Sequence, residues 1–258
     1  MSIKNDIAHY NLGNEFFALW LDDLMQYSCG DFSWTDQLDQ AQINKLNSII
    51  TELPITEGMK VLDLGCGWGG LSRYFKDHDI DVKPVCLSKE QKKHDPNIKL
   101  CHWRRVKGSY DVITCIEMLE HVQKKDYTDF FNKVYSLLNP KGRLYLQVIT
   151  FQKKKKTWVL DNIFPDGHIG TLDEIIESSR NSGLVLKSAK NDSDDYVKTL
   201  YLWHESIISN KECIIKMYGQ DFLNAWCRYL KTSQEGFKVG LTNLYRIIFE
   251  KSSYDKKS

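Results

Sequence analysis

The stretch Val61-Leu62-Asp63-Leu64-Gly65-Cys66-Gly67-Trp68-Gly69-Gly70 decides the fold that we expect for this chain. A short apolar run ends in an aspartate, and four glycines then lead into a helical pattern. Glycine adopts positive φ and lets a ligand approach the backbone closely. The helix that follows presents free N–H groups and the positive end of its dipole to that ligand. The stretch therefore predicts the first strand and turn of a doubly wound α/β sheet that holds a nucleoside.

Alternating strands and helices surround this stretch. The pattern predicts strands at 60–64, 82–87, 110–116 and 143–149, helices at 69–78 and 126–138, and a turn at 139–142. Such alternation indicates a parallel sheet. Apolar residues recur at helical spacing within residues 1–50, and a second helical segment is predicted at 40–53. After residue 150, the pattern predicts helices near 171–182, 196–208 and 219–235 and a late strand near 244–250.

The end of the second predicted strand argues against a dinucleotide enzyme. Such an enzyme needs an acidic residue there to hold the ribose of the cofactor. This strand ends in Cys86-Leu87-Ser88 instead. The glycine turn is therefore better suited to another nucleoside cofactor.

Composition limits the class of protein. A chain of 258 residues with 42% hydrophobic residues can form one large domain, and its net charge of +1 predicts no nucleic-acid partner. Its seven cysteines show neither paired nor metal-binding spacing, which is typical of reduced thiols and predicts no metal site. No signal peptide or membrane-spanning run is evident. We expect a cytoplasmic protein that can still touch a membrane surface.

Further blocks along the chain carry a resemblance to a known family. They are His9-Tyr10-Asn11-Leu12-Gly13-Asn14-Glu15-Phe16-Phe17, Met25-Gln26-Tyr27-Ser28-Cys29, Leu87-Ser88-Lys89-Glu90-Gln91, Phe164-Pro165-Asp166-Gly167 and the segment from Tyr196 to Trp203. With the glycine turn, these blocks resemble the cyclopropane fatty acid synthase family, in family order. This family contains mycolic acid cyclopropane synthases and coclaurine N-methyltransferase-like enzymes, and its members are class I S-adenosylmethionine (AdoMet)-dependent methyltransferases.

The resemblance implies an α/β fold with a Rossmann-like, mostly parallel seven-stranded sheet. It implies one domain over 1–258 with a helical N-terminal cap (1–53), an AdoMet-binding core (54–150), a substrate-covering insert (151–236) and a closing strand and tail (237–258). The implied AdoMet-binding residues are Tyr27, Ser28, Asp63, Gly65, Cys66, Gly67, Leu87, Ser88, Gln91 and Trp103. For two of them a structural role is an alternative, because Ser88 suits a helix N-cap and Trp103 suits the core.

The family passes a methyl group to a cis alkene, and a bound bicarbonate ion removes a proton so that a cyclopropane ring closes. The resemblance places Cys29, Glu120, Tyr196 and the backbone of Ile149 around that ion. Gln147 stands where the family has a histidine. Its amide can donate a hydrogen bond but cannot become cationic, so the predicted anion site is weaker.

Glu117 is a second departure, because cyclopropane synthases have glycine at this position. The run Ile116-Glu117-Met118-Leu119-Glu120-His121 resembles the corresponding run of the alkaloid N-methyltransferases, in which the first glutamate and the histidine serve an amine substrate. Glu117 and His121 are four residues apart and share a face if the run is helical. The alternatives are a cap or ion pair for Glu117 and a structural role for His121.

The leading prediction is methyl or methylene transfer to an unsaturated acyl chain, which gives a cyclopropane or a methyl branch. The second is N- or C-methylation of a small metabolite such as an amine, and the third is an AdoMet-binding protein without turnover. Four consecutive lysines at 153–156 suit phospholipid head groups or an acidic acyl carrier protein, or a solvated loop. The sequence predicts no oligomeric state.

Overall fold

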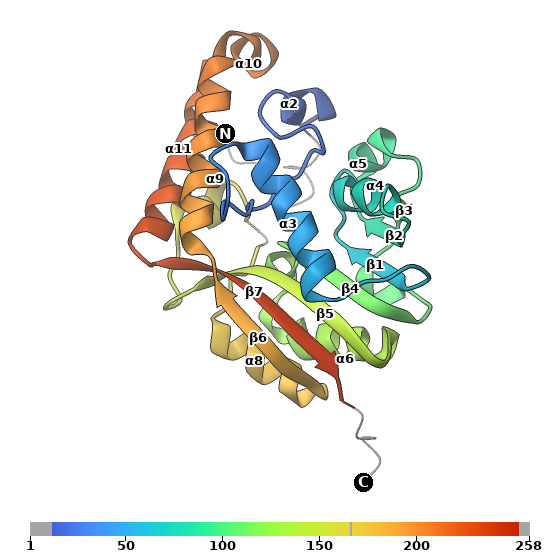
Figure 1. The fold of residues 1–258 in the computed structure, drawn as a ribbon. Helices are drawn as coiled ribbons and strands as arrows, with labels where there is room; N and C mark the ends of the chain where they lie inside the picture. Colours follow the sequence, from blue (N-terminus) through green and yellow to red (C-terminus); the bar gives the residue numbers. More distant parts are fainter. Residues whose placement is uncertain (1–11, 166, 253–258) are drawn as a thin grey trace.

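A seven-stranded sheet forms the centre of the protein (Figure 1), in a computed structural model that describes residues 12–165 and 167–252. The strands are β1 (Lys60–Leu64), β2 (Asp81–Cys86), β3 (Lys99–Leu100), β4 (Tyr110–Ile116), β5 (Leu138–Phe151), β6 (Leu184–Asn191) and β7 (Thr242–Lys251). Their order is β3-β2-β1-β4-β5-β7-β6, and β7 runs antiparallel to both of its neighbours while the other pairs are parallel. The predicted α/β class and its mostly parallel seven-stranded sheet are confirmed.

The helices are α2 (Asn14–Ala18), α3 (Leu38–Glu52), α4 (Gly70–Lys76), α5 (Lys89–His94), α6 (Tyr127–Leu137), α7 (Trp158–Asn162), α8 (Leu172–Asn181), α9 (Ser193–Ser209), α10 (Lys211–Tyr218) and α11 (Gln220–Lys238). The helices predicted at 40–53, 69–78, 126–138, 171–182, 196–208 and 219–235 are confirmed, with shifts of a few residues at their ends. Within the described residues, no helix combines the length and the apolar character that a membrane span requires.

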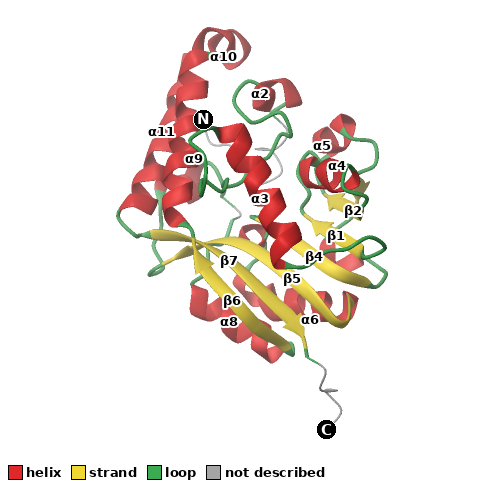
Figure 2. Cartoon of the chain, viewed as in Figure 1, coloured by secondary structure: helices red, strands yellow, loops and turns green. Residues whose placement is uncertain are grey.

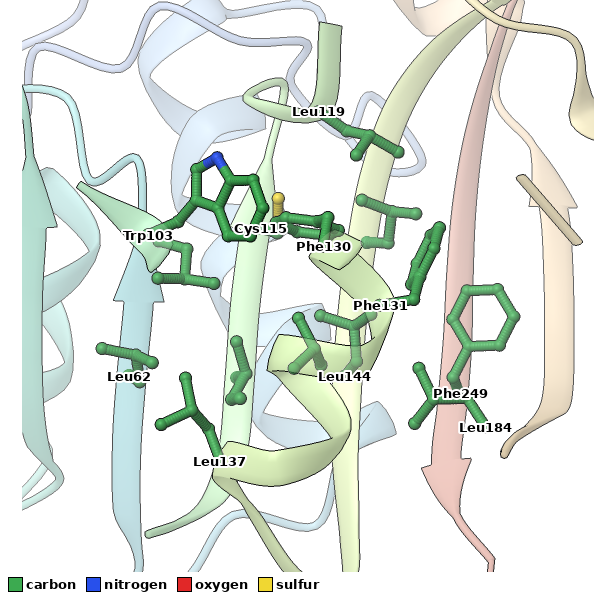
Figure 3. Packing of buried hydrophobic residues seen from close by; sticks show 14 of the residues in the cluster. Leu62, Trp103, Cys115, Leu119, Phe130, Phe131, Leu137, Leu144, Leu184 and Phe249 are labelled. Carbon is green, nitrogen blue, oxygen red and sulfur yellow. The ribbon is translucent and has the colours of Figure 1, made fainter. Parts of the chain in front are cut away.

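Side chains from alternate positions of each strand form separate cores on the two faces of the sheet. On one face, Val61 and Val112 pack with apolar residues of α3 and α4. On the other face, their neighbours Leu62 and Ile113 pack with α6 and α8. Figure 2 shows α3 across the front of the sheet and α6 and α8 behind it, and Figure 3 shows the core beneath α6. Helices on both faces explain why most residues of the central strands β1 and β4 are buried.

A helical layer of α2, α9, α10 and α11 stands beyond one end of the sheet (Figure 1). Its core is aromatic: Phe16 and Phe17 of α2 and Trp20 contact Trp226 of α11, with ring centroids 4.9–6.4 Å apart. Trp203 of α9 joins this cluster through an edge contact with Trp20. The layer therefore binds the N-terminal segment to helices from the last quarter of the chain.

The predicted helix over residues 1–50 is wrong for residues 19–37, which form turns and irregular backbone. Asp22 provides one reason, because its carboxylate accepts hydrogen bonds from the backbone N–H groups of Leu24 (3.1 Å) and Gln26 (2.7 Å). A side chain that satisfies nearby backbone donors competes with helix formation. Met25, with φ of 58°, then turns the chain toward the sheet.

Two other expectations need correction. The predicted turn at 139–142 lies inside β5, which begins at Leu138 and pairs irregularly with β4 in this region. Lys141, with φ of 63°, marks the irregularity. Strand β6 was not predicted, because seven of its eight residues are exposed at the edge of the sheet and lack an apolar alternation.

Parts of four predictions lie outside the described residues. These parts are residues 9–11 of the first family block, Asp166 of the fourth block, and positions 1–11 and 253–258 of the two terminal segments.

Candidate functional site

A cavity of about 600 Å³ opens at the carboxyl ends of β1 and β2. The ten residues predicted to bind AdoMet all line it: Tyr27, Ser28, Asp63, Gly65, Cys66, Gly67, Leu87, Ser88, Gln91 and Trp103. We call it the larger cavity. Its volume is typical of a site for a small organic ligand or cofactor.

The glycine turn shapes one wall of the larger cavity. Gly65 has φ of 82°, and a Cβ placed on it would lie 2.5 Å from Cγ of Met118. Gly67 has φ of 54°, and no atom lies within 4 Å of the position that its Cβ would take. The first glycine is therefore required by close packing, and the second leaves bare backbone beside open space.

Asp63 ends β1 and is 3% exposed. Its Oδ1 accepts a hydrogen bond of 2.8 Å from the hydroxyl of Thr114 on the adjacent strand β4. Burial raises the pKa of Asp63 to about 6, against the opposing effects of the Thr114 hydrogen bond and of nearby Lys45. A positively charged ligand group in the larger cavity would lower this pKa, since it favours the ionised carboxylate.

Ser88 and Trp103 combine the two roles that the sequence left open. The Ser88 hydroxyl accepts a hydrogen bond of 3.2 Å from the Gln91 N–H and caps α5, and both side chains line the larger cavity. The ring of Trp103 lines the same cavity and packs edge-on against Phe130 of the core at 5.4 Å. Each residue therefore has a structural role, as helix cap or core residue, and also lines the larger cavity.

Lys45 is a candidate that the sequence analysis missed. It lies on α3 with 1% exposure, lines the larger cavity, and donates hydrogen bonds of 2.6 Å to Ser28 Oγ and to Gln42 Oε1. Burial lowers the pKa of Lys45 to about 8. The signal was present, because Gln42 and Lys45 interrupt the apolar face of an otherwise ordinary amphipathic helix.

A smaller cavity of about 140 Å³ adjoins the larger one. Most of its wall is apolar: Ile149, Phe151, Val159, Leu160, Phe164, Ile169, Leu200, Phe237 and Leu241. Tyr27, Glu117 and His121 line both cavities, so these three residues mark the junction between them. Among the described residues, no group of His, Cys, Asp and Glu is arranged to hold a metal ion.

The Glu117 carboxylate receives three hydrogen bonds at this junction. Its Oε1 accepts from the Cys29 backbone N–H (2.9 Å) and from the Gln147 amide (2.8 Å). Its Oε2 accepts from the Tyr196 hydroxyl. Cys29 and Gln147 lie behind the carboxylate and line neither cavity. Three of the predicted catalytic residues thus converge on a fourth.

Glu120 lies close by but has different partners. Its Oε1 accepts a hydrogen bond of 2.7 Å from the Ile149 N–H, and its Oε2 has no hydrogen-bond partner in the part of the chain that the structure describes. Burial, followed by the charge of Glu117, raises the pKa of Glu120 to about 8. Glu120 is therefore largely protonated at neutral pH.

The condition under which Glu117 and His121 would share a helical face is not met, because the run 117–121 is not an α-helix. Glu117 has φ of 49°, in the left-handed region, and residues Leu119–His121 form a single 3₁₀ turn. An α-helix cannot include a left-handed residue. The two side chains share the junction because of this turn and not because of helical spacing.

Comparison with known proteins connects this geometry to a family. The sequence profile described as "Mycolic acid cyclopropane synthetase" matches residues 2–247. The chain is 33% identical over 255 residues to the cyclopropane-fatty-acyl-phospholipid synthase of Escherichia coli, and the match covers 94% of this chain and 66% of the relative. The chain thus spans slightly less than two thirds of that longer protein.

Two solved structures of cyclopropane synthases resemble this protein over nearly the whole chain. The cyclopropane synthase MmaA2 from Mycobacterium tuberculosis matches with a TM-score of 0.90 and 28% identity, over 95% of this chain and 97% of that one. The mycolic acid cyclopropane synthase CmaA1, solved in complex with SAH and CTAB, matches with a TM-score of 0.90 and 27% identity, over 96% and 98%. The protein therefore belongs to the mycolic acid cyclopropane synthetase family.

Proposed function

We propose that this protein is an AdoMet-dependent transferase that adds a methylene group to the double bond of an unsaturated acyl chain and forms a cyclopropane. One observation carries the proposal. The larger cavity, with its glycine turn and polar groups, meets the apolar smaller cavity at Tyr27, Glu117 and His121. A polar cofactor and a hydrocarbon chain can therefore meet at one point, which favours transfer between them.

The residues of the larger cavity suit AdoMet. The bare backbone at Gly67 leaves space for the cofactor, and Asp63 offers a buried carboxylate to an ammonium group. Ser88 and Gln91 offer polar atoms for ribose hydroxyls, and Trp103 offers an aromatic face for adenine. When bound, AdoMet supplies an electrophilic methyl group. The SAH in the CmaA1 complex supports this assignment, since SAH is what remains of AdoMet after methyl transfer.

The smaller cavity suits the acyl chain around its double bond. Its apolar wall binds hydrocarbon, and its volume of about 140 Å³ holds only a segment of a chain. Methylation of an alkene leaves a positive charge on carbon. The aromatic rings of Tyr27, Phe164 and Tyr229 line the cavity and can stabilise that charge. A hydrogen bond of 2.7 Å between the hydroxyls of Tyr27 and Tyr229 holds two of these rings in place.

Methylation of a small amine is the second candidate, and one observation favours it. Glu117 and His121 line the junction of the two cavities, where a carboxylate could attract an ammonium group and an imidazole could accept its proton. The apolar character of the smaller cavity favours the acyl chain instead.

One experiment separates these candidates. Purified protein and methyl-labelled AdoMet are incubated either with vesicles of unsaturated phospholipid or with a pool of small amines, and the products are analysed by mass spectrometry. The proposal predicts label in acyl chains that are one CH₂ heavier and lack the double bond. Label that appears only in amines would replace the proposal with the second candidate. AdoMet binding without any turnover would indicate an AdoMet-binding protein that is not an enzyme.

For the cationic segment 153–156, we further propose contact with an anionic phospholipid surface. Thr157, Val159 and Leu160 follow it directly and line the smaller cavity. The backbone N–H of Gln152 donates to the carbonyl of Leu241, another lining residue, at 3.0 Å. The four lysines thus stand beside the apolar cavity, where they can hold a lipid head group.

A double variant tests the membrane contact. Each lysine near an anionic surface contributes about 1 kcal/mol, so K153Q/K155Q should weaken binding to vesicles that contain phosphatidylglycerol by roughly tenfold or more. The matched control K83Q/K99Q removes the same charge from β2 and β3, at the far edge of the sheet, and should bind like the wild type. Equal losses for both variants, or binding to an acidic acyl carrier protein instead of vesicles, would contradict the contact.

A further inference from the structure

The donors around Glu117 have been brought together from distant parts of the chain. The Cys29 N–H comes from the irregular N-terminal segment, Gln147 from β5 and Tyr196 from α9. Three donors directed at one point form an anion-binding site, and here the anion is a side chain of the protein itself. Glu117 is only partly buried, and it lines both cavities. Its carboxylate thus lies where the cofactor and the acceptor would meet.

The backbone at Glu117 supports a specific role for its side chain. The residue adopts φ of 49°, a conformation that glycine takes readily and that other residues take at a cost. A hydrogen bond of 2.8 Å from the Glu117 N–H to the Gln147 carbonyl fixes this conformation. Left-handed residues of this kind gather at functional sites, where surrounding contacts hold them.

Arg246 orients the amide that contacts Glu117. It is 3% exposed, and its Nε donates to Gln147 Oε1 at 3.3 Å. Since the Gln147 oxygen faces this cation, its amide nitrogen must face Glu117 Oε1 and the Cys29 carbonyl. The glutamine that replaces the family histidine is thereby fixed as a donor to a carboxylate.

We infer that the Glu117 carboxylate is the base of the reaction and fills the site in which a free bicarbonate ion was expected. The inference rests on the proposed function. In the methylated alkene, Glu117 takes one proton from the newly added methyl group. The electrons of that C–H bond form the second carbon–carbon bond of the ring, which cancels the positive charge, and Glu117 later releases the proton to water. Charge and atoms balance without any external base.

The other predicted ligands of bicarbonate are consistent with this assignment. The Ile149 N–H donates to Glu120 Oε1, so this pair is already formed. The remaining donors, on Cys29, Gln147 and Tyr196, point to Glu117. Withdrawal from water raises the pKa of Glu117, against the opposing effects of its hydrogen bonds and of Lys45. A raised pKa makes a carboxylate a stronger base, as proton abstraction requires.

Three proteins test the inference: the wild type, E117Q and E117G. Turnover with unsaturated vesicles is measured in buffer depleted of carbon dioxide and again with added bicarbonate. We expect the wild-type rate to change less than about twofold between the two buffers. E117Q should lose at least about a hundredfold in turnover, the usual contribution of a general base, while it still binds AdoMet. E205Q, on the outer side of α9, is the matched control and should keep the wild-type rate.

Binding of ¹³C-labelled bicarbonate, observed by NMR, gives a readout that needs no turnover. Removing the side chain in E117G frees the donors of Cys29, Gln147 and Tyr196, so we expect E117G to bind the ion and the wild type not to bind it. A wild type that binds bicarbonate or requires it for activity would overturn the inference, as would full turnover by E117Q. If the wild type modifies no lipid at all, the proposed function fails, and the NMR comparison still decides what occupies the anion site.

Discussion

Replacing Glu120 with glutamine should make the stability of this protein less dependent on pH. Glu120 is 8% exposed, and burial raises the pKa of its carboxyl group from 4.5 to about 8. The native protein therefore binds this proton more tightly than the unfolded chain does. The resulting stabilisation is fully present below pH 4.5 and is lost as the pH rises toward 8.

The size of the effect follows from the two pKa values. One pKa unit corresponds to about 1.4 kcal/mol, so Glu120 should lower the free energy of unfolding by roughly 4 kcal/mol between about pH 5 and about pH 9. This change is a large part of the total stability of an ordinary domain. Glutamine keeps the Oε1 acceptor for the Ile149 N–H and cannot ionise, so the variant should not show this loss.

Urea denaturation at a series of pH values measures the difference directly. Subtracting the E120Q curve from the wild-type curve cancels the contribution of groups that titrate alike in both proteins. We expect the difference in the free energy of unfolding to change with a slope that approaches 1.4 kcal/mol per pH unit, the limit for one proton. Parallel curves would show that Glu120 ionises normally and would refute the structural argument for its protonated state.

Three further substitutions test other parts of the account. Gly58 and Gly65 share φ of 82°, but only at Gly65 would an added Cβ meet Met118. G65A should therefore unfold at a lower temperature than G58A in thermal scans, and it should weaken AdoMet binding in calorimetry. Equal effects of the two variants would contradict the steric argument. D63N should raise the Kd for AdoMet by about 10- to 100-fold in calorimetric titration, the range for a hydrogen bond to a charged group, and an unchanged Kd would exclude contact. R246M should lower the free energy of unfolding, measured by urea denaturation, by about 3 to 5 kcal/mol, because it leaves the buried carboxylates of Asp31 and Asp192 without their cation. A decrease below about 1 kcal/mol would contradict that role of Arg246.

The glycine turn shows what the sequence can predict. Residues 61–70 form strand, turn and helix because of short-range effects, namely an apolar run followed by glycines at positions of positive φ. Once β1 and the sheet order are fixed, the carboxyl end of β2 must lie beside the turn, which brings Ser88 and Gln91 to the same cavity. Local chemistry and the rules of parallel sheets were therefore sufficient here.

Glu117 shows where sequence reasoning stopped. The sequence left open whether the run around Glu117 is helical, and its side chain is held by donors that lie 88, 30 and 79 residues away along the chain. These contacts exist only after α9 and the N-terminal segment have packed over β5. Lys45 was missed for a similar reason, since its partner Ser28 comes from an irregular segment that was predicted to be helical.

The central claim is that this protein closes a cyclopropane ring on an unsaturated acyl chain, and AdoMet with a fully deuterated methyl group tests it most directly. The methyl carbon loses one hydrogen isotope when the ring closes. Mass spectrometry of the acyl chains should therefore show an added carbon that retains two of its three deuterium atoms and a double bond that has been consumed. An added carbon that retains all three deuterium atoms, or label in amines alone, would contradict the account.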